Sequence, residues 1–214
     1  MSEQDGAGLN SAGIDSLERA IRARAAANLV VDELLCRAAT ASGIRLAVLV
    51  EGRSDAAAVT ALAGRLGRDL DTEGAIVIPM GGAMSAARFF RVVGPDGLGW
   101  RVVGLCDAGE RSHFDRLLAA EGVFACERDL EEELLRALGV GRAEAVLEGQ
   151  GDLARFRTFQ KQPAQRGRPV ERQLHRFLGS VGGRKERYAG AMVAALPLDA
   201  VPPPLERLLA LLER

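Results

Sequence analysis

The segment Val48–Asp55 constrains the fold of this chain more than any other part of the sequence. An uninterrupted apolar run ends in Glu51, Gly52 follows it, and Asp55 comes about one helical turn later. Such a run is typical of a parallel strand that is covered on both faces. Because open α/β folds hold their ligands at the carboxyl ends of such strands, the segment predicts two acidic side chains at a binding edge of a sheet.

Strand and helix patterns alternate over the first two thirds of the chain, which indicates βαβ units and a parallel sheet. Beyond Gly139 the strand pattern stops and only helices are expected. The predicted strands are 44–50, 75–79, 100–106 and 123–126, with helices at 55–66, 83–93, 110–120 and 129–138. Further helices are predicted near 142–149, 152–160, 170–178, 184–196 and 203–213.

The expected fold class is α/β, with a parallel four-stranded sheet flanked by helices, a long N-terminal helix and a C-terminal helical extension. Asp15 followed by Glu18 resembles a capping box, which predicts one helix running to about Thr40. Its apolar stripe packs either on the sheet or against a second copy in a homodimer. The predicted organisation is a disordered N-terminus at 1–13, the helix at 14–42, the α/β domain at 43–140 and the extension at 141–214.

Charge is distributed unevenly, although the net charge of the chain is only −1. The segment from Asp107 to Glu148 contains eleven acids and five arginines, whereas the segment from Arg155 to Arg187 contains ten basic residues and two acids. This asymmetry predicts a negative site beside a surface that binds a polyanion. The alternative is a pair of ordinary solvated helical faces.

The cysteines and the hydropathy pattern indicate a cellular compartment. Cys36, Cys106 and Cys126 have no CxxC spacing and lie in apolar surroundings, so we expect buried thiols in a reducing cytoplasm. No apolar run approaches the roughly 18 residues of a membrane span, and no signal peptide is recognisable. The sequence therefore predicts a cytoplasmic protein with no membrane partner.

Three acids at strand ends or at a helix start are the first candidates for a cation site. Glu51 ends its strand where a long side chain has little room, and a surface glutamate is the alternative. Asp55 shares a helix face with Val59 and Leu62, and a first-turn acid that complements the helix dipole is the alternative. Asp107 ends the third predicted strand in the same way as Glu51.

Glu110 and Glu131 extend this set. Glu110 either adds a ligand or simply starts the next helix. On a helical wheel of about 100° per residue, Glu131 falls inside the apolar arc of its leucines, whereas Glu132 and Glu133 fall outside it. A buried unpaired carboxylate is costly, so Glu131 would need a cation. The alternative is a rotated helix with all three glutamates in solvent.

Carboxylate oxygens without nitrogen or sulfur ligands suit Mg²⁺ or Mn²⁺. Zinc is not expected, because His113 and His175 lack ligand spacing. The predicted metal ligands are Glu51, Asp55, Asp107, Glu110 and Glu131.

At these residues the chain resembles the Toprim domain, a Rossmann-like fold shared by topoisomerases, bacterial primases and several nucleases. The match consists of Glu51-Gly52-x-x-Asp55 and a strand ending in Asp107. Over 46–196 the chain is most similar to the Toprim half of OLD (overcoming lysogenisation defect) family endonucleases, including the turn at 79–82 and Asp129-Leu130-Glu131. The resemblance implies a catalytic lysine late in the chain, for which Lys185 is the match.

Two features depart from that family pattern. Gly109 stands where the second acid of an Asp-x-Asp motif is expected, so one metal would be weakly held unless Glu110 substitutes. The ABC-type ATPase half that the family usually carries is absent, and no P-loop motif is present. The resemblance therefore implies a separate ATPase partner or no nucleotide control.

The leading hypothesis is a metal-dependent endonuclease that acts on DNA, with RNA as an alternative substrate, in DNA repair or phage defence. Glu51, Asp107 and Lys185 would be catalytic, and one or two metal ions would activate water. The alternatives are a regulatory Toprim module that binds nucleic acid or an ATPase, and a primase-like nucleotidyl transferase. The residues expected to bind the nucleic-acid backbone are Arg155, Arg157, Lys161, Arg166, Arg168, Arg172, Arg176 and Arg184.

Overall fold

A four-stranded parallel sheet forms the centre of the molecule in this computed structural model, which describes residues 11–212. The strand order is β2-β1-β3-β4. Val50 of β1 lies opposite Pro79 of β2 and Leu105 of β3, so these strands end nearly level. The predicted strand positions are confirmed, with bounds β1 Leu46–Val50, β2 Ala75–Pro79, β3 Arg101–Asp107 and β4 Val123–Cys126.

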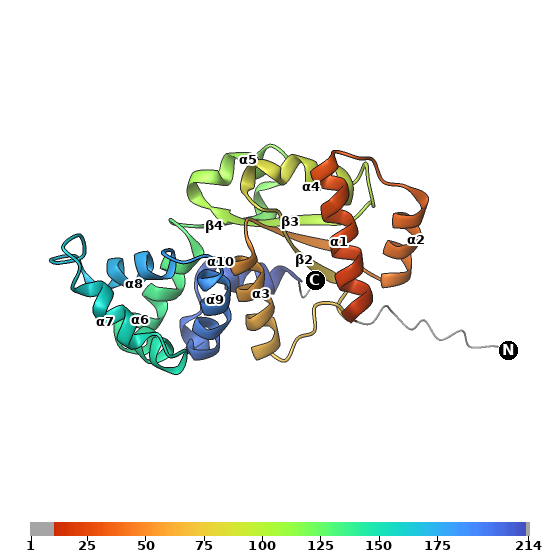
Figure 1. Cartoon of the computed structure of the whole chain (residues 1–214). Coiled ribbons are helices and arrows are strands. Elements are labelled where there is room, and N and C mark those ends of the chain that lie inside the picture. The colour runs from red at the N-terminus through yellow and green to blue at the C-terminus, as the bar shows by residue number, and fades with distance from the viewer. Residues whose placement is uncertain (1–10, 213–214) are drawn as a thin grey trace.

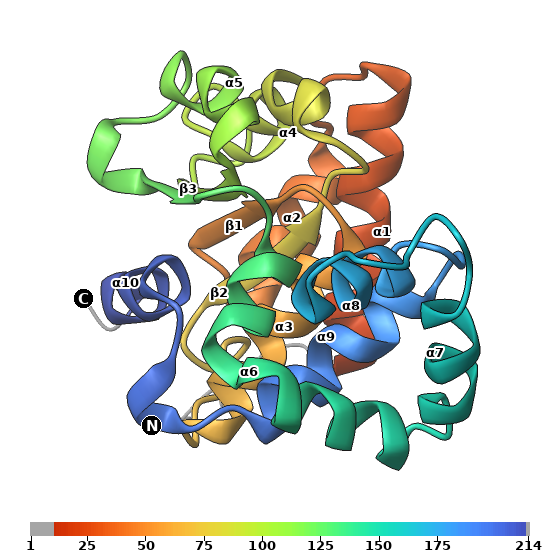
Figure 2. The same ribbon diagram turned by 90° about the vertical axis from the view of Figure 1, so that its left-hand side faces the viewer.

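Helices cover both faces of the sheet (Figures 1 and 2). On one face lie α1 (Ser11–Ala27), α2 (Glu33–Ser42), α4 (Ala86–Val93) and the short α5 (Arg111–Asp115). On the other face lie α3 (Arg53–Arg65), α6 (Leu130–Gly149), α9 (Arg184–Ala195) and α10 (Pro203–Leu212), with α7 (Leu153–Gln160) and α8 (Val170–Leu178) packed at their outer end.

Two hydrophobic cores follow from the alternation of side chains along the strands. Val48 and Val50 of β1 point into the core that includes α3, α6 and α9. Ala47 and Leu49 point into the core shared with α1, α2, α4 and α5. The predicted C-terminal helices therefore share a core with the sheet instead of forming a separate globule.

Gly104 in β3 lets α5 approach the sheet. A Cβ atom at this position would lie 2.3 Å from the ring of Phe114, and Phe114 is fully buried in α5. The absence of a side chain at Gly104 thus allows a very short helix to cover this face.

The predicted long N-terminal helix is wrong, because the chain forms α1 and α2 instead. Asn28 adopts a left-handed conformation with φ 54°, and Asp32 starts α2 by accepting a hydrogen bond from the Leu35 N–H. Such a capping oxygen satisfies a backbone donor that would otherwise have no partner. Residues 11–13 are helical, against the predicted disorder, and residues 1–10 lie outside the described part of the chain.

Several smaller expectations change as well. Helix 110–120 is reduced to a 3-10 turn at Ala108–Glu110 and the short α5, whereas α6 runs from 130 to 149 with a kink at Gly139, where φ is 69°. Cys106 and Cys126 are buried as predicted, but Cys36 is exposed. Among residues 11–212, no helix combines the length and apolarity that a membrane crossing requires.

Candidate functional site

The candidate site lies where the connections of two neighbouring strands leave the sheet in opposite directions. After β1 the chain enters α3 on one face, and after β3 it enters α5 on the other face. Such a divergence opens a crevice at the carboxyl edge, which is the usual ligand position in open α/β sheets. Glu51 directly follows β1 and Asp107 is the last residue of β3, so the topology itself brings them to the crevice.

Glu51 is held by its neighbours on both sides. Its side-chain Oε1 accepts a hydrogen bond from the Asp107 N–H at 2.9 Å. Its backbone carbonyl accepts from the N–H groups of Gly81 and Gly82, both at 2.9 Å. The loop after β2 is therefore joined to the end of β1, and both glycines adopt positive φ values to make this turn.

Asp55 lies in the first turn of α3, and its carboxylate caps that helix. Oδ2 accepts a hydrogen bond from the Gly52 N–H at 2.8 Å. This contact fixes the turn that follows Glu51 and keeps the two carboxylates on the same side of the sheet edge. Asp55 was expected to be either a site residue or a helix-capping acid. The same side chain caps the helix and faces the crevice.

Glu131 is buried in the first turn of α6, with 4% of its surface exposed, as the helical wheel predicts. Its Oε2 lies 3.1 Å from Nζ of Lys185 in α9. Its Oε1 is buried and has no hydrogen-bond partner among the described residues. A buried oxygen of this kind is costly unless something else satisfies it.

Glu133 corrects the helical-wheel prediction. It was expected in solvent but is 5% exposed. Its carboxylate accepts a hydrogen bond from the Glu127 N–H at 2.9 Å and pairs with Arg136. Because its charge is paired, burial of Glu133 reflects packing at the start of α6 and not a ligand role.

The carboxyl groups of the site raise one another's pKa. Burial raises the pKa of Asp107 to about 7, with further repulsion from Glu51 and Asp55. Burial and repulsion from Glu131 and Glu51 likewise raise the pKa of Asp55 to about 7. The pKa of Glu51 is also raised, chiefly by burial. Several carboxylates thus converge here with too little positive charge to balance them.

Lys185 is the cation that faces these acids. Burial lowers the pKa of Lys185, but attraction by Glu131 outweighs this effect and raises the pKa above its usual value. The side chain is 42% exposed, so its ammonium group reaches both Glu131 and solvent. The structure therefore brings Glu51, Asp55, Asp107, Glu131 and Lys185 to one edge, from five different segments of the chain.

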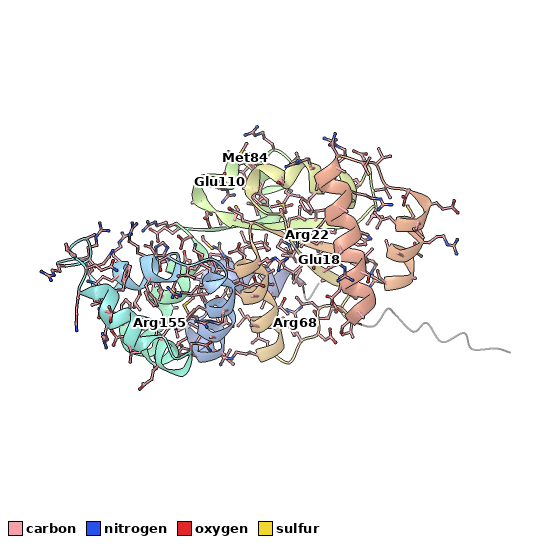
Figure 3. The ribbon with its side chains drawn as sticks, viewed as in Figure 1. Glu18, Arg22, Arg68, Met84, Glu110 and Arg155 are labelled. Carbon is pink, nitrogen blue, oxygen red and sulfur yellow. The ribbon has the colours of Figure 1, made fainter. Side chains whose placement is uncertain are left out.

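Glu110 is oriented differently from the other predicted ligands. It pairs with His113 at 3.3 Å and its side chain is 45% exposed. Its repulsion still contributes to the raised pKa of Glu51, so it lies near the crevice. In Figure 3 it lies on the same side of the sheet as Met84, whereas Arg155 lies in the helical region on the other side.

The basic residues expected to bind nucleic acid fall into two groups. Arg155 pairs with Asp152, Arg157 with Glu144 and Arg172 with Glu132. The Arg184 guanidinium lies 4.1 Å from the centre of the Phe177 ring and its side chain is only 10% exposed. The second group is exposed and forms no ion pair with the residues that the structure describes, and it supports the prediction best: Lys161, Arg166, Arg168 and Arg176.

The two phenylalanines of α7 and that of α8 form an edge-to-face cluster. The rings of Phe156 and Phe159 lie 5.3 and 5.5 Å from the ring of Phe177. Phe156 and Phe177 belong to the core that includes α6 and α9, and the half-buried Phe159 packs against it. Core packing, and not base stacking, accounts for their spacing.

The donors of the crevice fit the divalent cation that the family resemblance implies in their chemistry but not in their present spacing. Within residues 11–212, no three His, Cys, Asp or Glu side chains are close enough together to hold an ion as placed. Two of the carboxylates, those of Glu51 and Asp55, instead direct an oxygen at a backbone N–H. The unsatisfied Oε1 of Glu131 and the all-carboxylate chemistry nevertheless fit a hard cation such as Mg²⁺ or Mn²⁺.

Asp129 and His175 were not predicted as site residues. Asp129 caps α6 by accepting from the Glu132 N–H at 2.8 Å, and its other oxygen lies 2.6 Å from Nε2 of His175 in α8. Repulsion from Asp129 contributes to the raised pKa of Asp107. A capping pattern marks Asp129 in the sequence, but its contact with His175 depends on how α8 packs.

Comparison with known proteins identifies the domain. Residues 45–108 match the family model "Overcoming lysogenization defect protein-like, TOPRIM domain", and a comparison with curated proteins finds no match. The fold is similar to the C-terminal region of the Burkholderia pseudomallei OLD protein, with 22% identity and a TM-score of 0.59 over 79% of this chain and 97% of that chain. It is also similar to the C-terminal region of the Xanthomonas campestris pv. campestris OLD protein, with 25% identity and a TM-score of 0.58 over 79% and 94%. Residues 45–108 are therefore a Toprim domain of the overcoming lysogenization defect protein-like kind, set in the fold of the OLD C-terminal region.

Proposed function

We propose that this chain is a metal-dependent nuclease that cleaves phosphodiester bonds of DNA. The observation that carries the proposal is the pairing of Lys185 with Glu131 at 3.1 Å, at the same edge as Glu51, Asp55 and Asp107. A lysine among excess carboxylates is the arrangement needed to bind both a cation and a phosphate.

The roles follow from the position of each side chain. Glu51, Asp55, Asp107 and Glu131 would hold Mg²⁺ or Mn²⁺, which when bound stabilises negative charge and lowers the pKa of water. Lys185 donates a hydrogen bond to a non-bridging phosphate oxygen, because its partly exposed ammonium group reaches solvent. The exposed basic residues of the α7–α8 loop bind the nucleic-acid backbone, giving affinity that depends on salt and little on sequence.

Nicking of supercoiled plasmid tests this function. We expect wild-type protein to convert the plasmid to the open-circular form with Mg²⁺ or Mn²⁺ but not with EDTA. Glu51→Gln and Lys185→Ala should each reduce the rate by about 100-fold or more, whereas Glu148→Gln, at an exposed position in α6, should leave it unchanged. Full activity of Glu51→Gln, or no activity of the wild type with either metal, contradicts the proposal. Labelled RNA in parallel reactions tests substrate choice.

A regulatory module is the second candidate, and Gly109 favours it. Gly109 is exposed and supplies no oxygen ligand where the family resemblance leads us to expect an acid. In this case the chain binds nucleic acid or a separate ABC-type ATPase without cutting. Retention of DNA binding by wild type and Glu51→Gln alike, with no cleavage by either, would support this second function.

A further inference from the structure

Asp152 is a buried carboxylate that neither the predicted site nor the proposed mechanism uses. It lies just before α7 and is 1% exposed. Oδ1 accepts a hydrogen bond from Arg155 at 2.8 Å, and Oδ2 accepts from the Tyr188 hydroxyl at 3.0 Å and from Arg187. Arg184 lies 3.8 Å from the same oxygen. The hydrogen bond from Arg155, which outweighs the effect of burial, and the contacts with α9 lower the pKa of Asp152, so the group is a stable anion.

Three of these partners belong to the first turns of α9, and they flank Lys185 on both sides. Arg184 directly precedes Lys185, while Arg187 and Tyr188 follow within one turn. Tyr188 is 1% exposed and lies on the buried face of α9. Residues three apart on a helix are neighbours on its surface, so the anchored Tyr188 lies about one turn after Lys185 along α9.

The local sequence does not fix the start of α9 by itself. The helix follows Gly182 and Gly183, and Gly183 adopts a left-handed conformation with φ 74° and provides no side-chain cap. Glycine leaves the backbone free to adopt many directions. Contacts from other segments must therefore set the direction in which Lys185 projects.

Arg184 provides a second anchor that depends on the same region. Its Nη1 donates to the Phe177 carbonyl at 2.9 Å and to the Ser180 hydroxyl at 3.0 Å, and its guanidinium covers the Phe177 ring. These contacts hold the start of α9 against the end of α8. Asp152 contacts the same region from the residue just before α7, so the start of α7 and the end of α8 both meet the segment that carries Lys185.

We propose that Asp152 is a positioning residue that holds the first turns of α9 and thereby keeps the Lys185 ammonium group against Glu131. The inference rests on the proposed nuclease function only for its effect on cleavage, since the Lys185–Glu131 contact exists independently of any reaction. A buried charge paired with several arginines is rarely the most stabilising solution for a core position. Asp152 binds two side chains of α9, those of Arg187 and Tyr188, and an apolar side chain of the same size cannot hold them in this way.

Zero-length crosslinking measures this geometry directly. A carbodiimide activates a carboxyl group and joins it to an adjacent lysine as an amide, so Glu131 and Lys185 should be linked in the wild type at their 3.1 Å separation. The assignment is simple because Lys161 and Lys185 are the only lysines in the chain. Mass spectrometry of the digested protein gives the yield, and Glu131→Gln identifies the background.

Asp152→Asn removes the charge and keeps the shape of the side chain. We expect its Lys185–Glu131 crosslink to fall about five-fold or more, because amide formation needs both groups within bonding reach. In the plasmid assay we expect kcat to fall by about 10- to 100-fold with KM changed less than about two-fold. Asp152→Glu should recover part of both signals, and Asp199→Asn, an exposed control at residue 199, should change neither.

The crosslink separates this inference from the proposed function. A wild-type yield in folded Asp152→Asn overturns the positioning role, whether or not the protein cleaves DNA. If Asp152→Asn does not fold, Tyr188→Phe removes a single hydrogen bond to Asp152, and a reduced crosslink yield in that variant supports the role while an unchanged yield overturns it. Absence of cleavage in the wild type, with the crosslink still dependent on Asp152, rejects the nuclease function alone.

Discussion

Oε1 of Glu51 accepts a hydrogen bond from the backbone N–H of Asp107 at 2.9 Å. The contact joins the ends of β1 and β3, which are 56 residues apart in sequence. Through it, the two strand-end acids share one electrostatic environment, and the raised pKa values of Asp107 and Asp55 follow first from burial and then from repulsion by the neighbouring carboxylates.

Burial and mutual repulsion of these acids make the stability of the metal-free protein depend on pH. The pKa values of Asp55 and Asp107 are about 7 in the folded state against ordinary values of 3.8. The folded protein therefore retains protons that the unfolded chain has released, so the contribution of these groups to the unfolding free energy is full below about pH 4 and is lost as the pH rises through about 7. We expect the melting temperature in EDTA to fall over this range.

Asp107→Asn isolates the effect, since it removes one of these titrations. We expect a smaller decrease in melting temperature between pH 5 and pH 8 than in the wild type, and Asp199→Asn serves as the matched control. Mg²⁺ should raise the wild-type melting temperature more at pH 8 than at pH 5.5, because ligands must be deprotonated to bind it. Equal pH profiles for Asp107→Asn and wild type would contradict the raised pKa.

Gly109→Asp should strengthen cation binding by completing the Asp-x-Asp pattern after β3. The position is exposed, its φ is not positive, and no other atom lies within 4 Å of an added Cβ, so the substitution fits without strain. An additional carboxylate ligand should tighten Mn²⁺ binding by about ten-fold, measured by isothermal titration calorimetry. Gly141→Asp, another open position in α6, adds the same charge elsewhere and should have no effect; equal affinities of the two variants would reject a ligand position at 109.

Gly104→Ala should destabilise the protein. The added methyl group would lie 2.3 Å from the Phe114 ring, and overpacking of this kind costs about 1–3 kcal/mol. Gly64→Ala, in the last turn of α3, meets no atom within 4 Å and should instead stabilise by about 0.5 kcal/mol, because alanine has a higher helix propensity than glycine. Urea unfolding followed by circular dichroism compares both variants with the wild type, and a stabilised Gly104→Ala would show that α5 does not pack as described.

Replacement of Lys161, Arg166 and Arg168 by glutamine should weaken DNA binding without altering its sequence dependence. All three side chains are exposed in the loop between α7 and α8. Each phosphate contact contributes about −0.9 to the slope of log K against log salt concentration, so the slope should decrease by up to about 3 units in magnitude. Fluorescence anisotropy with a labelled duplex at several salt concentrations measures it.

A charge-matched control distinguishes local contacts from net charge. Arg37, Arg142 and Arg207 are exposed on other helices, and their replacement by glutamine changes the net charge by the same amount. Equal weakening by the two triple variants would show that the α7–α8 loop is not the binding surface.

The positions of the strand-end acids were predictable because they depend on local signals. An apolar run followed by Glu51 or by Asp107 marks a strand and its carboxyl end, and the parallel arrangement then places both at one edge. Burial of Glu131 was likewise predictable from the leucine periodicity of α6. Whether these residues bind a metal stays a prediction.

Other features depend on contacts between segments that periodicity does not reveal. Glu133 lies off the apolar arc, yet Arg136 and the Glu127 N–H allow its burial. Asp152 resembles an ordinary residue before a helix, and its burial arises only where α7 meets α9. The break between α1 and α2 depends on the left-handed Asn28 and the cap at Asp32. The apolar stripe is interrupted at Asn28 in the sequence but resumes beyond it, so periodicity alone favours one helix.

The pairing of Lys185 with Glu131 has a consequence for how such domains are recognised from sequence. The segment 45–108 that matches the family model carries Glu51, Asp55 and Asp107, but the lysine and its partner come from beyond it. A homologue can therefore retain a full-scoring match while losing the electrostatic balance of the crevice through changes far downstream. A match to residues 45–108 therefore reports the fold of the segment, whereas the charge balance of the crevice also depends on residues outside that match.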